Sequence, residues 1–380
     1  MAERPAPLVL VTTPPTEPEE PEFGTHVAIA AHGQRLLAAE LSQRLGRVGA
    51  AVASLPRAAP ANDVAFHWGR WFSAAGRAAL AGTGTGLDAL GYASGSSLAL
   101  VDDDALDGFL SPIAGEVVAN NRFSADAFVF AGDLDAALDR LTACPSDNAA
   151  PRWLHDGGFA WRDLGERPWA RFDVDTTLDL ALLRLATRLS GIRPLDASVL
   201  GFLEMARLPG GDALEVPELE RIGEVIRSRF AELVVAGRVP ASAWKALEAD
   251  AACRVRCVVE ERGMRSTRAP GQVPRSILAA LMARSSPADL IAELAMLGDA
   301  VILDTRVLMA SVARSSDTAA WPPAEDRFAS DFGDHRRVET PWLREFTEAA
   351  SSASVPFLFG GHALVSDGLR LIMAAAWQGR

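Results

Sequence analysis

The sequence predicts an α/β protein of two domains, the first built on a mostly parallel sheet and the second mainly helical. At 380 residues the chain exceeds what one hydrophobic core usually supports. As far as residue 190, short apolar runs alternate with stretches of helical length, which is the pattern of βαβ units. Longer helical stretches dominate after that point. We therefore expect an α/β domain at residues 1–190 and a mainly helical domain at 191–380 that contributes to the cleft.

The composition excludes several classes of protein. The net charge is -12 and the arginines form no run, so a nucleic-acid surface is not expected. Three cysteines are too few for a disulfide framework or a four-ligand zinc site. No secretory leader pattern is present, and no apolar stretch reaches the roughly 18 residues of a membrane helix. We expect a cytoplasmic protein, and the scarcity of lysine with abundant alanine is typical of a GC-rich bacterial genome.

Each expected element of the first domain has its own sequence signal. The strands are short apolar runs bounded by proline, glycine or polar residues, and the helices carry apolar residues at helical spacing. The expected strands are 8–11, 50–56, 97–101, 115–121 and 170–176. The expected helices are 33–50, 68–84, 102–112 and 133–144, with a leucine-rich helix after residue 176. Because such sheets bind ligands at the carboxyl ends of their strands, polar residues there are candidates for a site.

The second domain is dominated by helical stretches at 217–239 and 286–302. It closes at 355–377 with an apolar strand-like run, a Gly-Gly-His turn and an amphipathic helix. Few clear strands are expected between residues 191 and 354.

The stretch "FDVDTTLDL" combines two acids with a predicted strand-to-helix junction. Asp173 and Asp175 are two residues apart, so both would project from one face of a strand. Two carboxylates can hold Mg²⁺ beside a phosphate, because that ion prefers oxygen ligands. The alternative is structural, with Asp175 and Thr176 capping the helix and Asp179 favouring its first turn.

The stretch "VVANNRFSADAFVF" places several polar groups where a buried strand ends. Arg122 could bind a phosphate or carboxylate through two hydrogen bonds, with Asn121 and Ser124 fixing its orientation. Asn120 and Asp126 complete the group. The alternative is a hairpin in which the paired asparagines supply turn conformations.

Further candidates for substrate binding lie outside these two stretches. Asp147 and Asn148 precede the return of the chain to the sheet. Arg306 lies in an apolar run, where an ion pair with Asp304 is the structural alternative to a ligand contact. His362 follows two glycines before a helix and is either a substrate contact or a hydrogen-bonded structural histidine.

The junction "RFDVDTTLDLALL" resembles the "D-x-D-T-P-x-D-L" signature of nucleotidyltransferases related to molybdenum cofactor guanylyltransferase and phospholactate guanylyltransferase. The segment "GYASGSSLALVDDDALDGFL" is similar to their "G-D-x-P-L-L" segment. The resemblance implies a three-layer α/β/α domain of the nucleotide-diphospho-sugar transferase type. It also implies a reaction that joins a nucleoside triphosphate to a small phosphorylated acceptor, with Mg²⁺ as the cofactor. Asp173 and Asp175 would then be the catalytic metal ligands, and Asn121, Arg122 and Ser124 would orient the acceptor.

The chain departs from that family at two functional positions. The family's glycine-rich basic loop corresponds here to "TTPPTEPEEPEFG", which is acidic and lacks lysine, and its metal-binding Asp corresponds to Ser96. An alternative is therefore an inactive relative that binds a nucleotide or a phosphorylated metabolite, or acts as a scaffold. Motifs of zinc hydrolases, serine esterases, P-loop proteins and dinucleotide-binding proteins are absent from the sequence.

Overall fold

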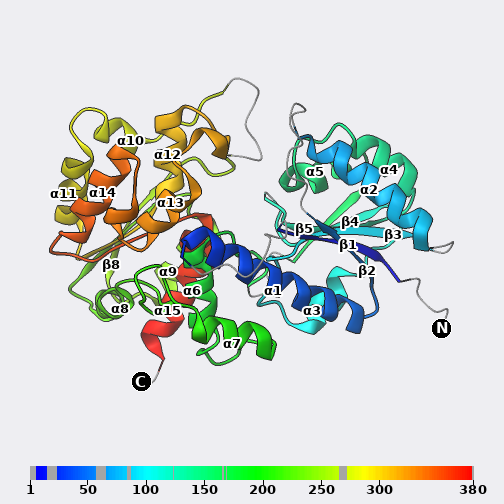
Figure 1. Ribbon diagram of the computed structural model, residues 1–380, viewed down its shortest axis with the longest axis horizontal. Coiled ribbons are helices and arrows are strands. Elements are labelled where there is room, and N and C mark those ends of the chain that lie inside the picture. The colour runs from blue at the N-terminus through cyan, green and yellow to red at the C-terminus, as the bar shows by residue number, and fades with distance from the viewer. Residues whose placement is uncertain are drawn as a thin grey trace. The chain divides into compact units, whose positions relative to one another are not determined.

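The computed structural model describes residues 6–14, 24–56, 66–83, 87–122, 124–164, 167, 169–264 and 272–378 (Figure 1). The chain divides into two compact units. The first unit comprises Met1–Pro21, Ala31–Asp173 and Leu195–Val199, and the second comprises Glu22–Ala30, Val174–Pro194 and Leu200–Arg380. Residues 174–190, which the sequence analysis assigned to the first domain, therefore group with the second unit. Most of the acidic loop, residues 15–23, lies outside the described residues.

The first unit contains a six-stranded mixed sheet whose strand order is β2-β1-β3-β5-β4-β6. Strands β1, β2 and β3 run parallel, β5 is antiparallel to both of its neighbours, and β4 runs parallel to β6. The strands are β1 (Leu8–Thr13), β2 (Ala51–Pro56), β3 (Ala89–Ser94), β4 (Glu116–Ala119), β5 (Ala127–Ala131) and β6 (Ala160–Asp163). One antiparallel strand thus interrupts an otherwise parallel sheet.

Helices cover both faces of this sheet, which gives the three-layer α/β/α arrangement expected from the sequence (Figure 1). One face packs on α1 and α3 through side chains such as Leu41 and Phe109. The other packs on α2, α4 and α5 through side chains such as Phe72, Leu138 and Leu154. The helices are α1 (His26–Arg47), α2 (Trp68–Thr83), α3 (Asp103–Phe109), α4 (Leu134–Leu141) and α5 (Ala150–His155). Asp102 caps the start of α3, since its side chain accepts the N–H of Ala105 at 2.7 Å.

The strand expected at 97–101 does not form, and β3 lies earlier in the chain. Residues 97–101 instead make buried turns, with Leu98 at a φ of 59°. The reason is a buried arginine of α1, because the Arg44 guanidinium donates to the carbonyls of Leu98, at 3.0 Å, and Val101. These carbonyls are thereby satisfied without a neighbouring strand.

The strand expected at 170–176 is reduced to a single bridge between Ser97 and Asp173. The Asn120 side-chain amide donates to the carbonyl of Ala170 at 3.1 Å, so a side chain replaces the strand ladder there. The fifth strand, β5, was not among the predicted strands. It pairs antiparallel with β4, so the hairpin of the structural alternative is confirmed, but neither Asn120 nor Asn121 has a positive φ.

The second unit is rich in helix, as expected, but its helices surround a parallel sheet that the sequence analysis did not predict. The strand order is β10-β9-β7-β8, and every pairing is parallel. The strands are β7 (Glu232–Gly237), β8 (Arg254–Val259), β9 (Ala300–Asp304) and β10 (Phe357–Gly360). Strands β7 and β9 are short apolar runs next to helical segments, and periodicity alone does not separate such runs from buried helix.

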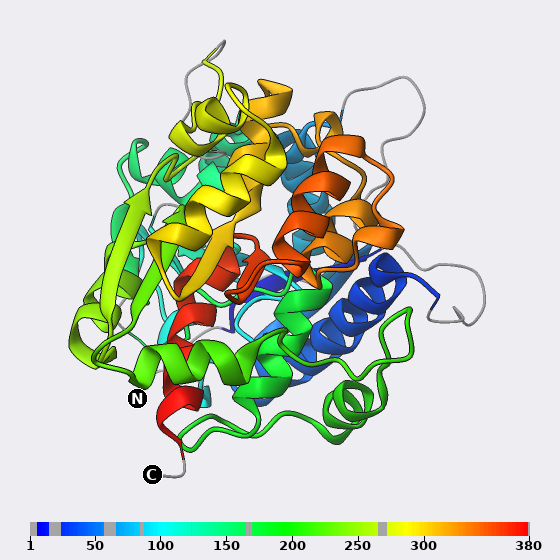
Figure 2. The same cartoon turned by 90° about the vertical axis from the view of Figure 1, so that its left-hand side faces the viewer.

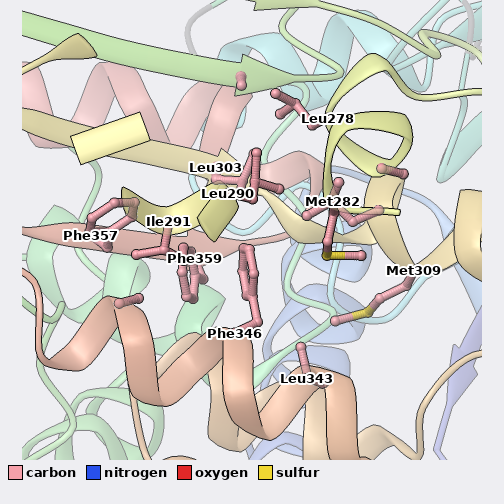
Figure 3. Close-up of a cluster of buried hydrophobic side chains, with 14 of the residues drawn as sticks. Leu278, Met282, Leu290, Ile291, Leu303, Met309, Leu343, Phe346, Phe357 and Phe359 are labelled. Atoms are coloured by element: carbon pink, nitrogen blue, oxygen red, sulfur yellow. The ribbon is translucent and has the colours of Figure 1, made fainter. Parts of the chain in front are cut away.

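The remaining helices begin with α6 (Thr177–Ala186), α7 (Ala197–Met205) and α8 (Leu219–Arg227). The rest are α9 (Ala241–Asp250), α10 (Ile277–Met282), α11 (Pro287–Leu297), α12 (Thr305–Ala313), α13 (Ala324–Asp331), α14 (Pro341–Ser351) and α15 (Leu369–Trp377). In the core on one face of the sheet, Phe346 of α14 stacks on Phe359 of β10 with ring centroids 4.9 Å apart (Figure 3). Leu278, Met282 and Leu290, from α10 and α11, extend the same core.

Candidate functional site

The carboxyl ends of three strands of the first unit meet at one edge of its sheet. The turn after β3 is tied to the end of β1, because the Gly95 N–H donates to the Thr12 carbonyl at 3.0 Å. The Ser94 N–H donates to the Asp126 carbonyl at 2.8 Å, which brings the segment before β5 to the same edge. The Leu164 N–H donates to the carbonyl of Ala119, the last residue of β4. In open α/β sheets this edge is where ligands bind.

Glycine is required at the turn after β3. A Cβ at Gly95 would overlap the Cβ of Ala38 on α1 and lie 2.5 Å from the Thr12 carbonyl oxygen. The tight approach of helix and turn brings the hydroxyl groups that follow to the sheet edge.

A chain of hydroxyl groups links this turn to the first acid of the "DVD" motif. The Ser96 hydroxyl donates to Asp173 Oδ1 at 3.0 Å, and the hydroxyl oxygens of Ser94 and Ser96 also lie 3.0 Å apart. Ser96 is buried and Asp173 is half-buried. The residue that stands where the resemblance implies a metal-binding Asp therefore contacts the predicted metal ligand directly.

Asn120 holds the polar stretch after β4 in shape. Its side-chain oxygen accepts the N–H groups of Asp126 and Ala127, at 3.0 and 3.1 Å, and its amide donates to the Ala170 carbonyl. Asn120 is fully buried, so these contacts satisfy backbone groups that water cannot reach. The geometry makes Asn120 a positioning residue for the segment that carries Arg122 and Ser124.

Two more predicted residues, Asp147 and Asn148, join this segment. The Asn148 amide donates to Asp126 Oδ1 and to the Ala125 carbonyl, each at 3.1 Å. The hydroxyl of Tyr92, on β3, donates to Asp147 Oδ2 at 3.0 Å. The structure thus brings together Asn120, Asp126, Asp147 and Asn148 in the first unit.

Three other predicted residues of this segment differ in exposure. Asn121 is buried, Ser124 is half-buried and Arg122 is exposed. The Arg122 guanidinium carbon lies 5.9 Å from the centre of the Trp161 ring on β6. An exposed guanidinium held over an aromatic face keeps its donor groups available to an anion.

Asp175 and the residues after it form a helix cap in the second unit. Thr176 is the N-cap of α6 and exchanges hydrogen bonds with Asp179 in a capping box, so the capping alternative is confirmed with Thr176 as the cap. Asp179 Oδ2 accepts from the N–H groups of Asp175 and Thr176, at 3.0 and 2.8 Å. Burial, reinforced by the charge of Asp175, raises the pKa of Asp179 to about 7. Asp175 itself is exposed, and its role as a metal ligand stays a prediction.

Arg306 lies at the carboxyl edge of the second unit's sheet, but its partner differs from the expected one. Its guanidinium makes two hydrogen bonds to the carboxylate of Asp331, at 2.7 and 2.5 Å. Burial alone would lower the pKa of Arg306, but the carboxylate of Asp331 outweighs it and raises that pKa. The expected ion pair between Asp304 and Arg306 is therefore wrong, because Asp331 supplies a better-aligned carboxylate.

Asp304 ends β9 and pairs with Arg238, which follows β7. The Arg238 Nε and Nη2 donate to the Asp304 carboxylate at 2.5 and 3.0 Å. Burial would raise the pKa of Asp304, but the charge of Arg238, with smaller contributions from His362 and Arg306, holds it below its usual range. His362, the remaining predicted residue, follows Gly360 and Gly361 at this edge.

The first turn of α1 carries a buried histidine that the sequence analysis did not consider. The Glu325 carboxylate accepts the N–H groups of His26 and Val27, each at 3.0 Å, and the His26 ring stacks on Phe332. Neither ring nitrogen of His26 has a hydrogen-bond partner among the described residues. Burial, helped by Arg337, lowers the pKa of His26 although nearby carboxylates oppose the change.

The roles of Tyr92 and Arg238 were not predicted from the sequence, and neither was the pairing of Asp331 with Arg306. Only the folded chain brings each of these residues next to its partner. Within the described part of the chain, no group of three or more His, Cys, Asp or Glu side chains could hold a metal ion. No described helix has the length and apolar character needed to cross a bilayer.

No protein-family model matches the chain, and no curated protein matches it. Among solved structures the chain is similar to one from Desulfovibrio desulfuricans G20, described as a "putative nucleotide-diphospho-sugar transferase". The two are 15% identical with a TM-score of 0.37, and the match covers 52% of this chain and 93% of the other.

Proposed function

We propose that the first unit binds a nucleotide or a phosphorylated metabolite at the carboxyl edge of its sheet. The observation that carries the proposal is the convergence, at this edge, of the hydroxyl groups of Ser94 and Ser96 with the amide-rich network around Asn120. Hydroxyl groups bind sugar hydroxyls and phosphate oxygens, the network around the buried Asn120 positions the segment that carries Arg122, and Arg122 supplies a positive charge for an anion.

A second candidate is transfer of a nucleotidyl group from a nucleoside triphosphate to a small phosphorylated acceptor with Mg²⁺. The half-buried carboxylate of Asp173 at the same edge favours it. Mg²⁺ is often held by one or two carboxylates together with substrate phosphates, so a large protein cage is not required. Positioning and charge neutralisation then supply most of the catalysis.

The contact between Ser96 and Asp173 favours binding over transfer. A serine hydroxyl is a weak Mg²⁺ ligand, and here it donates to an oxygen of the carboxylate that the metal would need. This hydrogen bond leaves Asp173 able to coordinate a metal, because metal-binding carboxylates commonly accept hydrogen bonds too, but Ser96 supplies no second carboxylate.

Thermal unfolding with nucleoside triphosphates and diphosphates, with and without Mg²⁺, separates the two candidates. A ligand at a hundred times its Kd adds about 2.7 kcal/mol to the free energy of unfolding. Stabilisation that is independent of Mg²⁺ supports binding, whereas Mg²⁺-dependent stabilisation with pyrophosphate release supports transfer. No stabilisation by any nucleotide or sugar phosphate would contradict both.

Three variants locate the site. Arg122→Ala should weaken binding, while Arg77→Ala, which removes an exposed arginine paired with Asp139 on the same unit, should leave it unchanged. Asp173→Asn should abolish any pyrophosphate release but keep metal-independent binding. Equal effects of the two arginine variants would place the ligand elsewhere.

A further inference from the structure

Strand β8 is one of the two outermost strands of the second unit's sheet, with β10 at the other edge (Figure 2). Among the described strands it pairs only with β7, from the match of Arg254 with Glu232 to that of Val259 with Gly237. An outermost strand presents unpaired N–H and C=O groups to its surroundings, and proteins usually cover such an edge or pair it.

Alternate residues of β8 direct their backbone groups outward. The N–H groups of Arg254 and Glu260 donate to the carbonyls of Ala231 and Gly237, so the even-numbered positions face β7. Val255, Cys257 and Val259 therefore present their N–H and C=O groups to the open side.

The side chains of β8 divide into an apolar row and a charged row. Val255, Cys257 and Val259 lie on one face of the sheet, and the Val259 side chain is 54% exposed. The other face carries Arg254, Arg256 and Val258; Val258 packs against the core, and the two guanidinium groups turn back to the Glu232 carboxylate on β7, at 2.8 and 3.1 Å. Because both guanidinium groups turn toward β7, they do not cover the outward N–H and C=O groups of β8.

Exposed apolar side chains lie beside both ends of the strand. Near its end, the Ile277 N–H donates to Glu260 at 2.8 Å, and the Ile277 side chain is 60% exposed. Near its start, Arg256 donates to the Leu297 carbonyl at 3.0 Å, next to Met296, which is 82% exposed. Both contacts are made by residues on the face of Arg254 and Arg256, so exposed apolar side chains flank the strand on that face, while Val259 is exposed on the other.

We propose that this edge is a homodimer interface in which β8 pairs antiparallel with β8 of a second copy, about a two-fold axis at Cys257. The occupant is a second copy because the strand is complementary to itself. In this register Arg254 lies opposite Glu260 of the second copy, Val255 lies opposite Val259, and Cys257 lies opposite Cys257. Each outward-facing residue meets another outward-facing residue, so each such pair exchanges two hydrogen bonds.

Neighbouring registers are disfavoured by charge. A two-fold axis perpendicular to the sheet keeps each row of side chains on its own face. Directly opposite residues must then come from the same row, so the axis can pass through a residue but not between two residues. An axis at Arg256 would place that arginine opposite itself, and an axis at Val258 would place Arg254 opposite Arg262. Only the axis at Cys257 opposes unlike charges without a like-charged pair directly opposite.

The main test is the mass of the protein in solution, measured by sedimentation over a range of micromolar concentrations. Wild type should be a dimer. Val259→Pro removes an outward N–H and should weaken dimerisation about tenfold or more, because two intermolecular hydrogen bonds are lost across the two-fold axis. Val259→Thr keeps the N–H and is the matched control. A monomeric wild type, or a folded Val259→Pro variant that dimerises normally, would overturn the proposal.

Charge reversal tests the register without relying on proline. Arg254→Glu should weaken the dimer by placing two acids opposite each other; Glu260 is left unchanged, because its carboxylate accepts hydrogen bonds from Ser276 and Ile277. Mild oxidation should join the two copies through Cys257, because directly opposed residues in a hydrogen-bonded pair have Cα atoms about 5.5 Å apart. Burial raises the pKa of the Cys257 thiol to about 11, so the reaction needs a catalyst such as copper phenanthroline. A wild-type dimer without this product would refute the register.

Discussion

Replacing Asp179 with Asn should change how the stability of the protein depends on pH. Asp179 is fully buried at the start of α6, where one oxygen accepts hydrogen bonds from Asp175 and Thr176. Its other oxygen has no partner among the described residues. Because burial disfavours the charged form, the folded state holds a proton on this carboxyl up to a pH of about 7.

The size and sign of the effect follow from the pKa of Asp179, which folding raises from 3.8 to about 7. Below both pKa values the carboxyl is protonated in the folded and the unfolded state, so burying it costs no ionisation and the free energy of unfolding is at its highest with respect to this group. Between them only the unfolded chain ionises, so the free energy of unfolding falls by about 1.4 kcal/mol per pH unit. The loss reaches about 4 kcal/mol once the pH has passed the folded-state value.

Asp179→Asn removes the titration while keeping an oxygen that can accept the capping hydrogen bonds. Urea unfolding at about pH 4 and pH 8 should therefore show the variant gaining about 4 kcal/mol relative to wild type across this range. Asp289→Asn is the matched control, because Asp289 occupies the same position in the exposed cap of α11. Parallel pH dependence of wild type and Asp179→Asn would refute the reasoning and mean that the capping hydrogen bonds keep the carboxylate ionised.

Three further substitutions test the described contacts. His26→Phe should reduce the loss of stability in acid, because burial lowers the pKa of His26 and only the unfolded chain takes up a proton there as the pH falls below 6.5. Urea midpoints of wild type and variant at about pH 7 and pH 5 measure this. Equal losses of stability in the two proteins would contradict it. Asn120→Ala should cost about 3 kcal/mol in urea unfolding, because it leaves buried backbone groups unpaired, and a cost below about 1 kcal/mol would argue against the network. Gly237→Ala should lower the melting temperature far more than Gly158→Ala. Both glycines have a positive φ, but only at Gly237 would the new Cβ overlap Asp304. Similar losses in the two variants would mean that backbone strain alone causes the loss of stability.

Local signals predicted the parts of the fold that depend on neighbours in the sequence. Strands β1, β2 and β4 are apolar runs with clear ends, and the side chain of the predicted cap Thr176 bonds within three residues. The position of β3 was not predictable in this way. It depends on Arg44, which reaches across from α1 to satisfy the carbonyls of residues 98 and 101.

The sheet of the second unit illustrates a different limit. In "ELVVAG" and "DAVILD" the apolar residues form an unbroken run, which satisfies a buried strand and a buried helix equally well. The ion pairs Arg238–Asp304 and Arg306–Asp331 could not be predicted from the sequence either, because each joins residues that become neighbours only where the parallel strands end. The polar residues at 120–126 and 147–148 were recognisable because amide and acid groups are dense there, although which of them hold the backbone depends on the fold.

The acids of "DVDTTLD" differ in their surroundings, and this narrows what the motif can do. Asp173 contacts Ser96 at the sheet edge of the first unit, Asp175 is exposed, and Asp179 is buried in a helix cap. A helix cap and a metal site make the same demand on a sequence, because both need oxygen atoms at a strand-to-helix junction. The cap accounts for Thr176 and Asp179, so Asp173 is the acid with the strongest claim to a ligand role. Since one carboxylate binds Mg²⁺ weakly by itself, any metal at this edge would have to arrive with the phosphates of a nucleotide.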